Sequence, residues 1–369
     1  MMNRIVSTFL LSSLFLVGGT FDVFSQANVE RFEASKLNDY GVVYSLPRTE
    51  IEVEAIVRKE AFQPGPFAGY ARTYLGKAVR TEPSTRYSIR AIRVRSVGVA
   101  DPDHKYVVEF RSGTVAPFVY LNDKGLICAI NAGEGVSPYS SREDKSMEDM
   151  LQNIPFPVYP DPSFPQEYAL AGSMSKKADI AAKYLFDIRE GKVDLMKGDV
   201  DAMPKDGASL KIALEALEMQ EAATLALFEG TSSQEESVYR VHVNPEASMN
   251  NRTIFRFSEF YGPTSADDLS GAPVTLDLKV LENTAPQSPE EERKMEKGLK
   301  GIIYNVPGKA EVTIKYDGKA LISRELPVVQ FGQRQSLIPK LFKVRKDDNI
   351  QVVFDPETGA IEQIHGIQK

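Results

Sequence analysis

The sequence predicts an α+β protein in which two β-rich units are separated by an antiparallel helical hairpin. Three observations predict this class. Apolar and polar residues alternate in segments from position 42 to 130 and again from position 239 onward, which is the period of half-buried strands. Two stretches between these regions have the 3.6-residue apolar period of helices. The two β-rich units are expected to be sandwich-like or barrel-like. A possible internal repeat, described below, would make them copies of each other.

The N-terminus has the layout of a secretory signal peptide. Arg4 precedes an apolar run from Ile5 to Val17, which is shorter than the roughly 20 apolar residues of a membrane-spanning helix. Ser25 is small and suits cleavage before Gln26. We expect residues 1–25 to be removed on export. A buried N-terminal helix is the alternative.

The first β-rich domain is predicted over residues 26–165. Ile51, Val53 and Ala55 alternate with glutamates, as in a strand with one buried face. One short helix is expected after Pro64-Gly65-Pro66, and Gly76 can end it in a left-handed conformation. Five prolines between positions 155 and 165 then disfavour a regular strand or a continued helix, so this exit segment is predicted to be a linker or a segment that lies along the surface of the domain.

The helical hairpin is predicted over residues 166–231. Ser175 can cap the first helix, and Asp206 can cap the second helix, which Gly230 ends. Since each helix has one apolar stripe, antiparallel packing against the other helix is the simplest arrangement.

The second β-rich domain is predicted over residues 232–369. One capped helix interrupts it, with Ser288 at the cap, Pro289 at the first helical position and Glu291 completing a capping box. The expected strands are Val241–Val243, Thr253–Phe257, Val274–Val280, Glu311–Tyr316 and Ile350–Phe354.

An internal repeat is indicated by two pairs of similar segments. Gly41-Val-Val-Tyr-Ser-Leu-Pro47 is echoed by Gly301-Ile-Ile-Tyr-Asn-Val-Pro307, and the turn at residues 121–126 is echoed by the turn at residues 354–360. Because both pairs occur in the same order, they favour duplication of a β unit. Chance recurrence of similar hairpins is the alternative.

Composition and charge argue against several classes of function and structure. The formal net charge of −7 argues against nucleic-acid binding. Cys128 is the only cysteine, so no internal disulfide can form, and its apolar neighbours indicate a small buried side chain. No segment after the first 25 residues is long and apolar enough to predict a transmembrane helix.

Catalytic and metal signatures are mostly missing. His104, His242 and His365 lie far apart and lack the spacing of a helical zinc site. Neither a tightly bound metal nor another cofactor is expected. The Asp199-Val200-Asp201 segment begins like a calcium loop but lacks the later ligands, so a turn between helices is predicted.

Ser173-Met-Ser-Lys176 matches the S-x-x-K of penicillin-recognising enzymes, but the other two motifs of that signature are absent. A helix-capping role for this serine motif is therefore favoured over catalysis.

Three carboxylates support an alternative hypothesis of hydrolysis. Glu259, Asp267 and Asp268 could supply paired carboxylates for cleaving an envelope polysaccharide. Because the chain has no tryptophan to stack on sugars, solvated loop charges are the simpler interpretation.

A basic segment from Tyr70 to Ser96 stands out against the acidic chain. It contains seven Lys or Arg residues and one acidic residue, Glu82. Arginine forms two-point hydrogen bonds with phosphate and carboxylate more readily than lysine does. The segment therefore predicts a surface for an anionic partner, with a solvated strand face as the alternative. The candidate binding residues are Arg72, Arg80, Arg86, Arg90, Arg93 and Arg95.

Several motifs resemble a family of secreted proteins of Bacteroides-like bacteria that is defined by a domain of unknown function. They include Thr81-Glu-Pro-Ser-Thr85, Phe255-Arg-Phe-Ser-Glu259 and Gln330-Phe-Gly332. The resemblance implies export and a mixed β and helical architecture, and it implies no catalytic residues.

The sequence as a whole predicts an exported, non-enzymatic protein of the periplasm or outer membrane with a binding or scaffold role. The expected partner is an envelope protein or an anionic envelope component. The alternative is the polysaccharide hydrolase described above.

Overall fold

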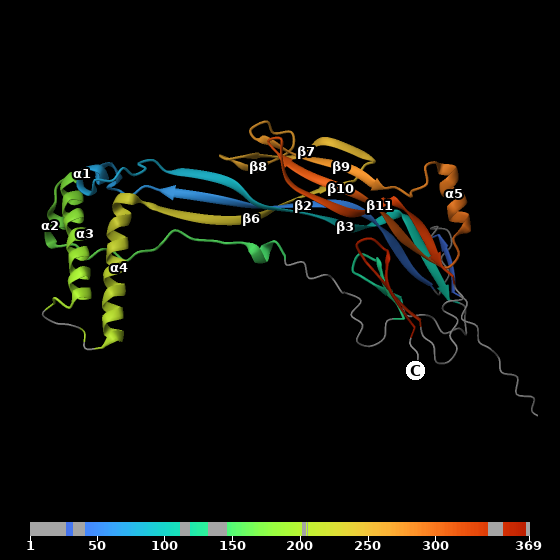
Figure 1. Ribbon diagram of the computed structural model, residues 1–369, viewed down its shortest axis with the longest axis horizontal. Coiled ribbons are helices and arrows are strands. Elements are labelled where there is room, and N and C mark those ends of the chain that lie inside the picture. The colour runs from blue at the N-terminus through green and yellow to red at the C-terminus, as the bar shows by residue number, and fades with distance from the viewer. Residues whose placement is uncertain are drawn as a thin grey trace, which may run out of the picture.

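The computed structural model describes residues 27–31, 41–110, 119–131, 146–200, 204, 206–338 and 350–366. Three antiparallel β-sheets form the body of the molecule, and helices lie at both of its ends (Figure 1). The predicted signal peptide, residues 1–25, lies outside the described residues.

The first sheet is a long ladder in the strand order β1-β3-β2-β6. Residues 51, 53, 55 and 57 point from β2 into a core, as the alternation in the sequence predicts. The four strands are β1 (Ala27–Arg31), β2 (Gly41–Gln63), β3 (Ser84–Phe110) and β6 (Thr231–Val243).

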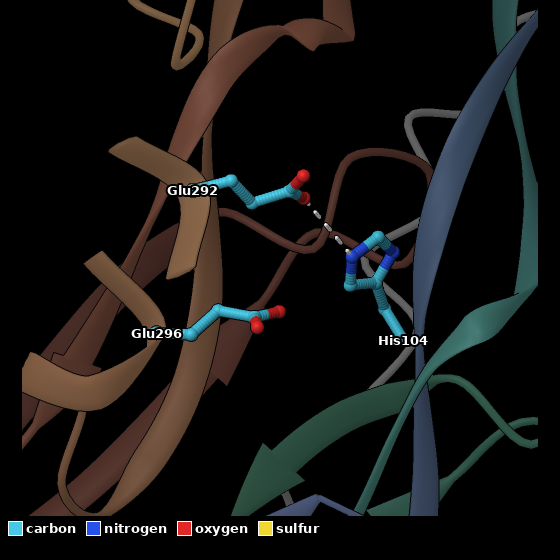
Figure 2. Close-up of side chains that lie close together, drawn as sticks. All are labelled: His104, Glu292 and Glu296. Carbon is cyan, nitrogen blue, oxygen red and sulfur yellow. Dashed lines mark ion pairs between the residues drawn. The ribbon is translucent and has the colours of Figure 1, made fainter. Parts of the chain in front are cut away.

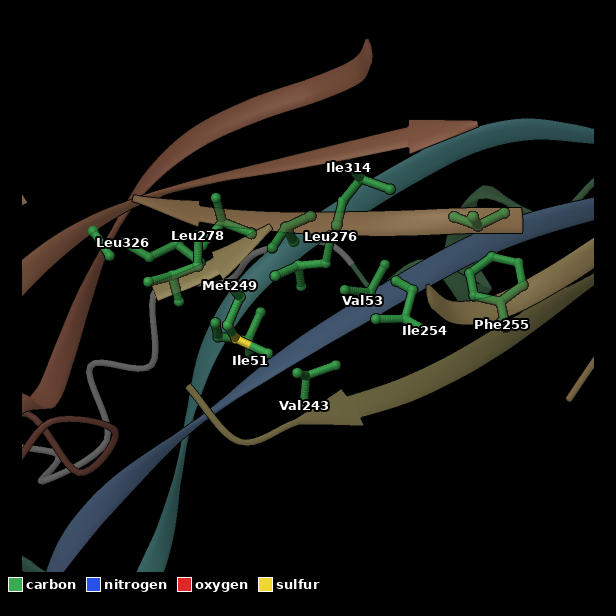
Figure 3. Packing of buried hydrophobic residues seen from close by; sticks show 14 of the residues in the cluster. Ile51, Val53, Val243, Met249, Ile254, Phe255, Leu276, Leu278, Ile314 and Leu326 are labelled. Atoms are coloured by element: carbon green, nitrogen blue, oxygen red, sulfur yellow. The ribbon is translucent and has the colours of Figure 1, made fainter. Parts of the chain in front are cut away.

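The second sheet packs face to face on the first and has the order β11-β10-β9-β7-β8. Figure 3 shows Ile51, Val53 and Val243 of the first sheet beside Leu276 and Ile314 of the second. The two sheets therefore form a sandwich with an apolar centre. Its strands are β7 (Ser248–Ser258), β8 (Gly262–Thr264), β9 (Ala272–Glu282), β10 (Ile302–Tyr316) and β11 (Lys319–Leu337).

The third sheet is short and has the order β13-β12-β5-β4. Phe354 and Ile127 of this sheet pack against Tyr44 of β2 and Ile302 of β10 in a second core. Two of the three sheets thus combine strands from the N-terminal and C-terminal β-rich regions. The four strands are β4 (Val119–Leu121), β5 (Ile127–Ile130), β12 (Ile350–Phe354) and β13 (Ile361–Gly366).

The helices begin and end close to where the sequence predicts. Ser173 caps α3 and Asp206 caps α4, each accepting a hydrogen bond from the backbone three residues on. Gly76 follows α1 with φ of 67°, as a left-handed stop requires. The helices are η1 (Ala68–Tyr70), α1 (Ala71–Leu75), η2 (Glu148–Met150), α2 (Gln166–Leu170), α3 (Met174–Lys197), α4 (Gly207–Glu229) and α5 (Pro289–Gly298).

The two segments of the predicted repeat occupy equivalent places in two long hairpins. From Ser45 to Arg48 the partner on β3 moves from residue 105 to residue 99, so six positions face three. From Asn305 to Gly308 the partner on β11 moves from residue 334 to residue 328, again six for three. Both hairpins therefore carry three extra residues on the second strand, opposite Leu46 in the first hairpin and opposite the next motif position, Pro307, in the second.

Each long hairpin also contacts the glycine turn that follows it in the same way. The Ser45 amide donates to the carbonyl oxygen of Gly125, and the Asn305 amide donates to that of Gly359, both at 3.0 Å. Gly125 and Gly359 have φ of 74° and 70°, which favours glycine. A long hairpin followed by a short one thus occurs twice, in the order that the sequence repeat predicts.

Within the described part of the chain, no helix is both long enough and apolar enough to cross a membrane.

Candidate functional site

The outer face of the first sheet carries a ladder of charged residues around buried glutamates. Glu54 on β2 is 1% exposed and receives hydrogen bonds from Arg93 of β3 at 2.7 Å and Arg240 of β6 at 2.9 Å. Burial alone would raise the pKa of Glu54, but these two hydrogen bonds outweigh it and hold the pKa below its usual range. Glu52 accepts from Arg95 at 2.5 Å one row along.

Glu236 forms a second buried centre on β6. Arg58 and Arg90 each approach its Oε1 atom at 2.9 Å. The backbone amide of Gln152 donates to Oε2 at 2.8 Å. Burial opposes ionisation here too, but the Gln152 and Arg58 hydrogen bonds lower the pKa of Glu236. The carboxylate therefore remains charged at neutral pH.

Three of the six predicted anion-binding arginines face these glutamates. Arg90, Arg93 and Arg95 each form an ion pair with a carboxylate of β2 or β6. The positive charge of the segment, which motivates the prediction, is thus offset across the sheet at these positions. Binding of an external anion by these three arginines stays a prediction.

Two other predicted arginines, Arg80 and Arg86, line one cavity of about 310 Å³, which we call the basic cavity. The Arg80 guanidinium lies 3.9 Å above the centre of the Phe62 ring, a cation–π distance. It also donates to Ser84 Oγ at 3.4 Å. The lining residues are Glu60, Ala61, Phe62, Arg80, Ser84, Arg86, Ile154, Ser232, Ser233 and Gln234.

Strand register explains why these residues converge. Phe62 of β2 pairs with Ser84 of β3 and Ser232 of β6, and Glu60 pairs with Arg86 and Gln234. Because side chains two residues apart share a face of a strand, both rows lie on the charged outer face. Only Glu60 supplies a carboxylate to the lining, against two arginines, so the basic cavity keeps an excess of positive charge.

Arg72, the sixth predicted residue, is exposed in the last turn of α1 and does not line the basic cavity. It provides a natural comparison for the two cavity arginines, since it belongs to the same basic segment.

A second cavity of about 250 Å³ lies where the two copies of the repeat meet, and we call it the junction cavity. Pro47 and Asn305 of the two repeated motifs line it. Asp101 and His104, from the irregular segment of β3, and Gln330, from the irregular segment of β11, also line it. The Asp101 carboxylate contacts His104 Nδ1 at 2.7 Å.

His104 lies next to two glutamates of α5, as Figure 2 shows. One ligand-type atom from each of His104, Glu292 and Glu296 lies within 4.8 Å of the others. Arg334 of β11 interacts with all three: its guanidinium lies 2.8 Å from Glu292 and 3.5 Å from Glu296, and it contacts His104 Nε2.

A fixed guanidinium charge therefore occupies the region that a metal ion would need. We interpret His104, Glu292, Glu296 and Arg334 as an ion-pair network that links α5 to β11 and β3. The expectation that no metal binds tightly stays a prediction.

The three carboxylates of the hydrolase hypothesis lie near β8. Glu259 is in the turn before β8, and Asp267 and Asp268 follow that strand; all three residues are exposed. The Ser270 amide donates to Asp268 at 2.9 Å, which lowers the pKa of Asp268. Neither of the two cavities described above is lined by these residues, and hydrolysis stays a prediction.

The other sequence candidates have simple local roles. Ser173 Oγ accepts from the Lys176 amide at 3.2 Å, and Lys176 Nζ pairs with Asp179 at 3.0 Å. The S-x-x-K match is therefore a helix cap, made by Ser173 rather than by the predicted Ser175. Cys128 is buried, and burial raises the pKa of its thiol, which disfavours a reactive thiolate. Asp201 of the calcium-like segment lies outside the described residues.

Sequence reasoning missed the buried glutamates and the junction cavity. The alternating glutamates at positions 52 and 54 can be read from the sequence. The 20 residues between Gln63 and Ser84 separate β2 from β3, however, so the register that pairs these glutamates with arginines of β3 cannot be read from it. His104 and α5 are far apart in sequence, and only the extra residues of β3 bring them together. No spacing rule could reveal that contact.

Comparison with known proteins gives one family. The model of a family described as a domain of unknown function (DUF4831) matches residues 40–362, which is most of the chain. Neither the curated proteins nor the solved structures include a match.

Proposed function

We propose that this chain, which belongs to the DUF4831 family, is a binding protein that holds a small oxyanion, or the anionic end group of a larger molecule, in the basic cavity. One observation carries the proposal: Arg80 and Arg86 line one cavity together with only one carboxylate. Elsewhere on this face of the sheet, Arg90, Arg93 and Arg95 of the basic segment form ion pairs with glutamates.

The remaining lining groups suit an oxyanion. Ser84, Ser232 and Ser233 supply hydroxyl groups that can donate hydrogen bonds to phosphate or carboxylate oxygens. The Phe62 ring supports the Arg80 guanidinium, so less side-chain entropy is lost when a ligand binds. A volume of about 310 Å³ suits one small group rather than a folded partner.

Calorimetric titration tests the proposal with three probes: inorganic phosphate, glucuronate and phosphatidylglycerol vesicles. These probes separate free phosphate, acidic sugar and lipid headgroup as sources of the oxyanion. We expect Arg80→Gln and Arg86→Gln each to weaken binding at least about tenfold, because a charge-assisted hydrogen bond contributes roughly 1.5–3 kcal/mol. Arg72→Gln is the matched control and should bind as the wild type does.

Affinity should also fall as salt rises, because exposed charges are screened over about 8 Å at physiological ionic strength. Failure of all three probes to bind, or equal affinity in the Arg80→Gln and Arg86→Gln variants, would overturn the proposal.

We further propose that the protein acts in the cell envelope after export. The support is the signal-peptide layout of residues 1–25. Intact-mass analysis of the exported protein should give a chain that begins at Gln26. A mass that includes residues 1–25 would contradict export by cleavage.

A further inference from the structure

The α3–α4 pair leaves apolar side chains uncovered along its outer length. Phe186 and Met196 of α3 are 49% and 65% exposed, and Ile212 and Met219 of α4 are 66% and 53% exposed. Near the sheets the pair is well covered, since Ala178, Ala181 and Phe228 pack with Phe67 in a small core. These exposed apolar side chains lie outside the small core, and Met174 in the first turn of α3 is exposed as well.

Two helices cannot bury the apolar residues that α4 carries. Leu210, Leu214 and Leu217 are only half-buried. The buried residues of α4 are Ala223, Thr224 and Phe228, all in its last two turns. A helix that is apolar on several faces is normally surrounded by other helices. Figure 1 shows the Gly207 end of α4 extending away from the sheets, with α3 as its neighbour.

Spacing and charge indicate what covers this surface. Phe186 and Val193 are seven residues apart on α3, as are Ile212 and Met219 on α4, which is the spacing of a helix–helix seam. The two helices also differ in charge. Helix α3 contains six Lys or Arg and four Asp or Glu residues, a formal charge of +2, whereas α4 contains one Lys and four Glu residues, a formal charge of −3.

We propose that a second copy of the chain covers this surface, so that two α3–α4 pairs form a four-helix bundle. A two-fold axis along the bundle places the basic α3 of each copy beside the acidic α4 of the other. Within one copy, Arg189 and Lys192 of α3 pair with Glu221 of α4 at 2.7 Å and 2.9 Å. The dimer would bring α3 and α4 of different copies together with the same charge complementarity. The partner is thus complementary in charge and in apolar spacing.

Light scattering on a sizing column tests the proposal with the full mature chain. We expect a dimer whose dissociation constant rises at least about a hundredfold in the double variant Ile212→Glu, Met219→Glu, because association would bury unpaired charges. Leu269→Glu is the matched control: Leu269 is 80% exposed in the loop after β8, and this change should leave the dimer intact. Circular dichroism confirms that each variant folds.

Chemical cross-linking supplies an independent measurement. Cys128 is buried, so Met219→Cys provides the one accessible thiol among the described residues, and a bifunctional maleimide should convert this variant to a covalent dimer. The two copies of α4 lie diagonally across the bundle, further apart than the roughly 7 Å between Cα atoms that a disulfide can span, so a longer linker is required. A monomeric wild type at about 100 µM, or unchanged association in the double glutamate variant, would overturn the proposal.

Discussion

At the scale of single residues, the outer face of the first sheet depends on carboxylates that are buried yet ionised. Glu54 and Glu236 are 1% and 3% exposed, and each is held by two arginines. Removing one partner of a buried ion pair lowers the free energy of unfolding by more than the intact pair contributes to it, because the remaining charge stays buried without a counter-charge. These glutamates therefore fix the arginines of the basic segment in place.

We predict that Glu54→Gln lowers the free energy of unfolding by about 2–4 kcal/mol. The change removes the buried carboxylate that both Arg93 and Arg240 contact. Urea denaturation measures the effect, with Glu50→Gln as the control. Glu50 is partly exposed and lies 3.9 Å from Arg48, so its loss should cost under about 1 kcal/mol. Equal losses in both variants would contradict this account.

The same glutamates predict a dependence of stability on pH. The folded protein holds the pKa values of Glu54 and Glu236 below their usual range, so folding favours their ionised forms. Their contribution is fully present above the ordinary glutamate pKa of about 4.3 and is lost as pH falls through the folded values. Urea midpoints between neutral pH and about pH 3 should fall less steeply for Glu54→Gln than for the wild type. Parallel curves would contradict the prediction.

Local charge alone singles out Arg80 and Arg86 as candidate binding residues, and that role stays a prediction. The structure places both residues in the lining of one cavity. Their neighbours Ser232 and Gln234 come from β6, about 150 residues further along the chain. Register between distant strands is set by packing, so no local pattern contained the full lining.

At the scale of elements, the extra residues in the two long hairpins create the junction cavity. Gly332 lies among the extra residues of β11, and a Cβ atom there would lie 2.0 Å from the carbonyl oxygen of Val306. Only glycine allows the strand to pass this close to β10. The local sequence around Gly332 is thus adapted to the shape of the repeat.

We predict that Gly332→Ala destabilises the fold by about 2 kcal/mol or more, because backbone must shift to admit the methyl group. Gly298→Ala is the matched control, since a Cβ atom at Gly298 meets nothing within 4 Å. Its unfolding free energy should stay within about 0.5 kcal/mol of the wild type. Thermal and urea unfolding measure both variants, and a tolerated Gly332→Ala change would show that the close approach is not required.

Helices and strands themselves were largely predictable from local signals. Ser288 caps α5 and accepts from the Glu291 amide at 3.3 Å, as the capping box predicts. The strand partners were less accessible, because β6 pairs with β2 across the helical pair and β12 pairs with β5 across the second sheet. Pairing at such separations depends on the whole core rather than on any segment.

At the scale of the whole molecule, the basic cavity lies where the strands of the first sheet meet the helical end. Gln63 ends β2 and Thr231 begins β6 as a register pair beside the cavity, and α4 ends at Glu229. Figure 1 shows the α1–α4 helices at this end and α5 at the other. The proposed ligand site and the proposed dimer contact therefore share one end of the molecule, while the junction cavity lies at the other.

Retention of the protein by isolated cell envelopes measures anion binding at Arg80 and Arg86 in the proposed setting. We predict that wild-type protein and the Arg72→Gln variant sediment with envelopes at low salt and are released as salt rises. The double variant Arg80→Gln, Arg86→Gln should remain in the supernatant while folding normally by circular dichroism. Equal sedimentation of the double variant and the wild type, or retention that does not change with salt, would contradict an oxyanion site at Arg80 and Arg86.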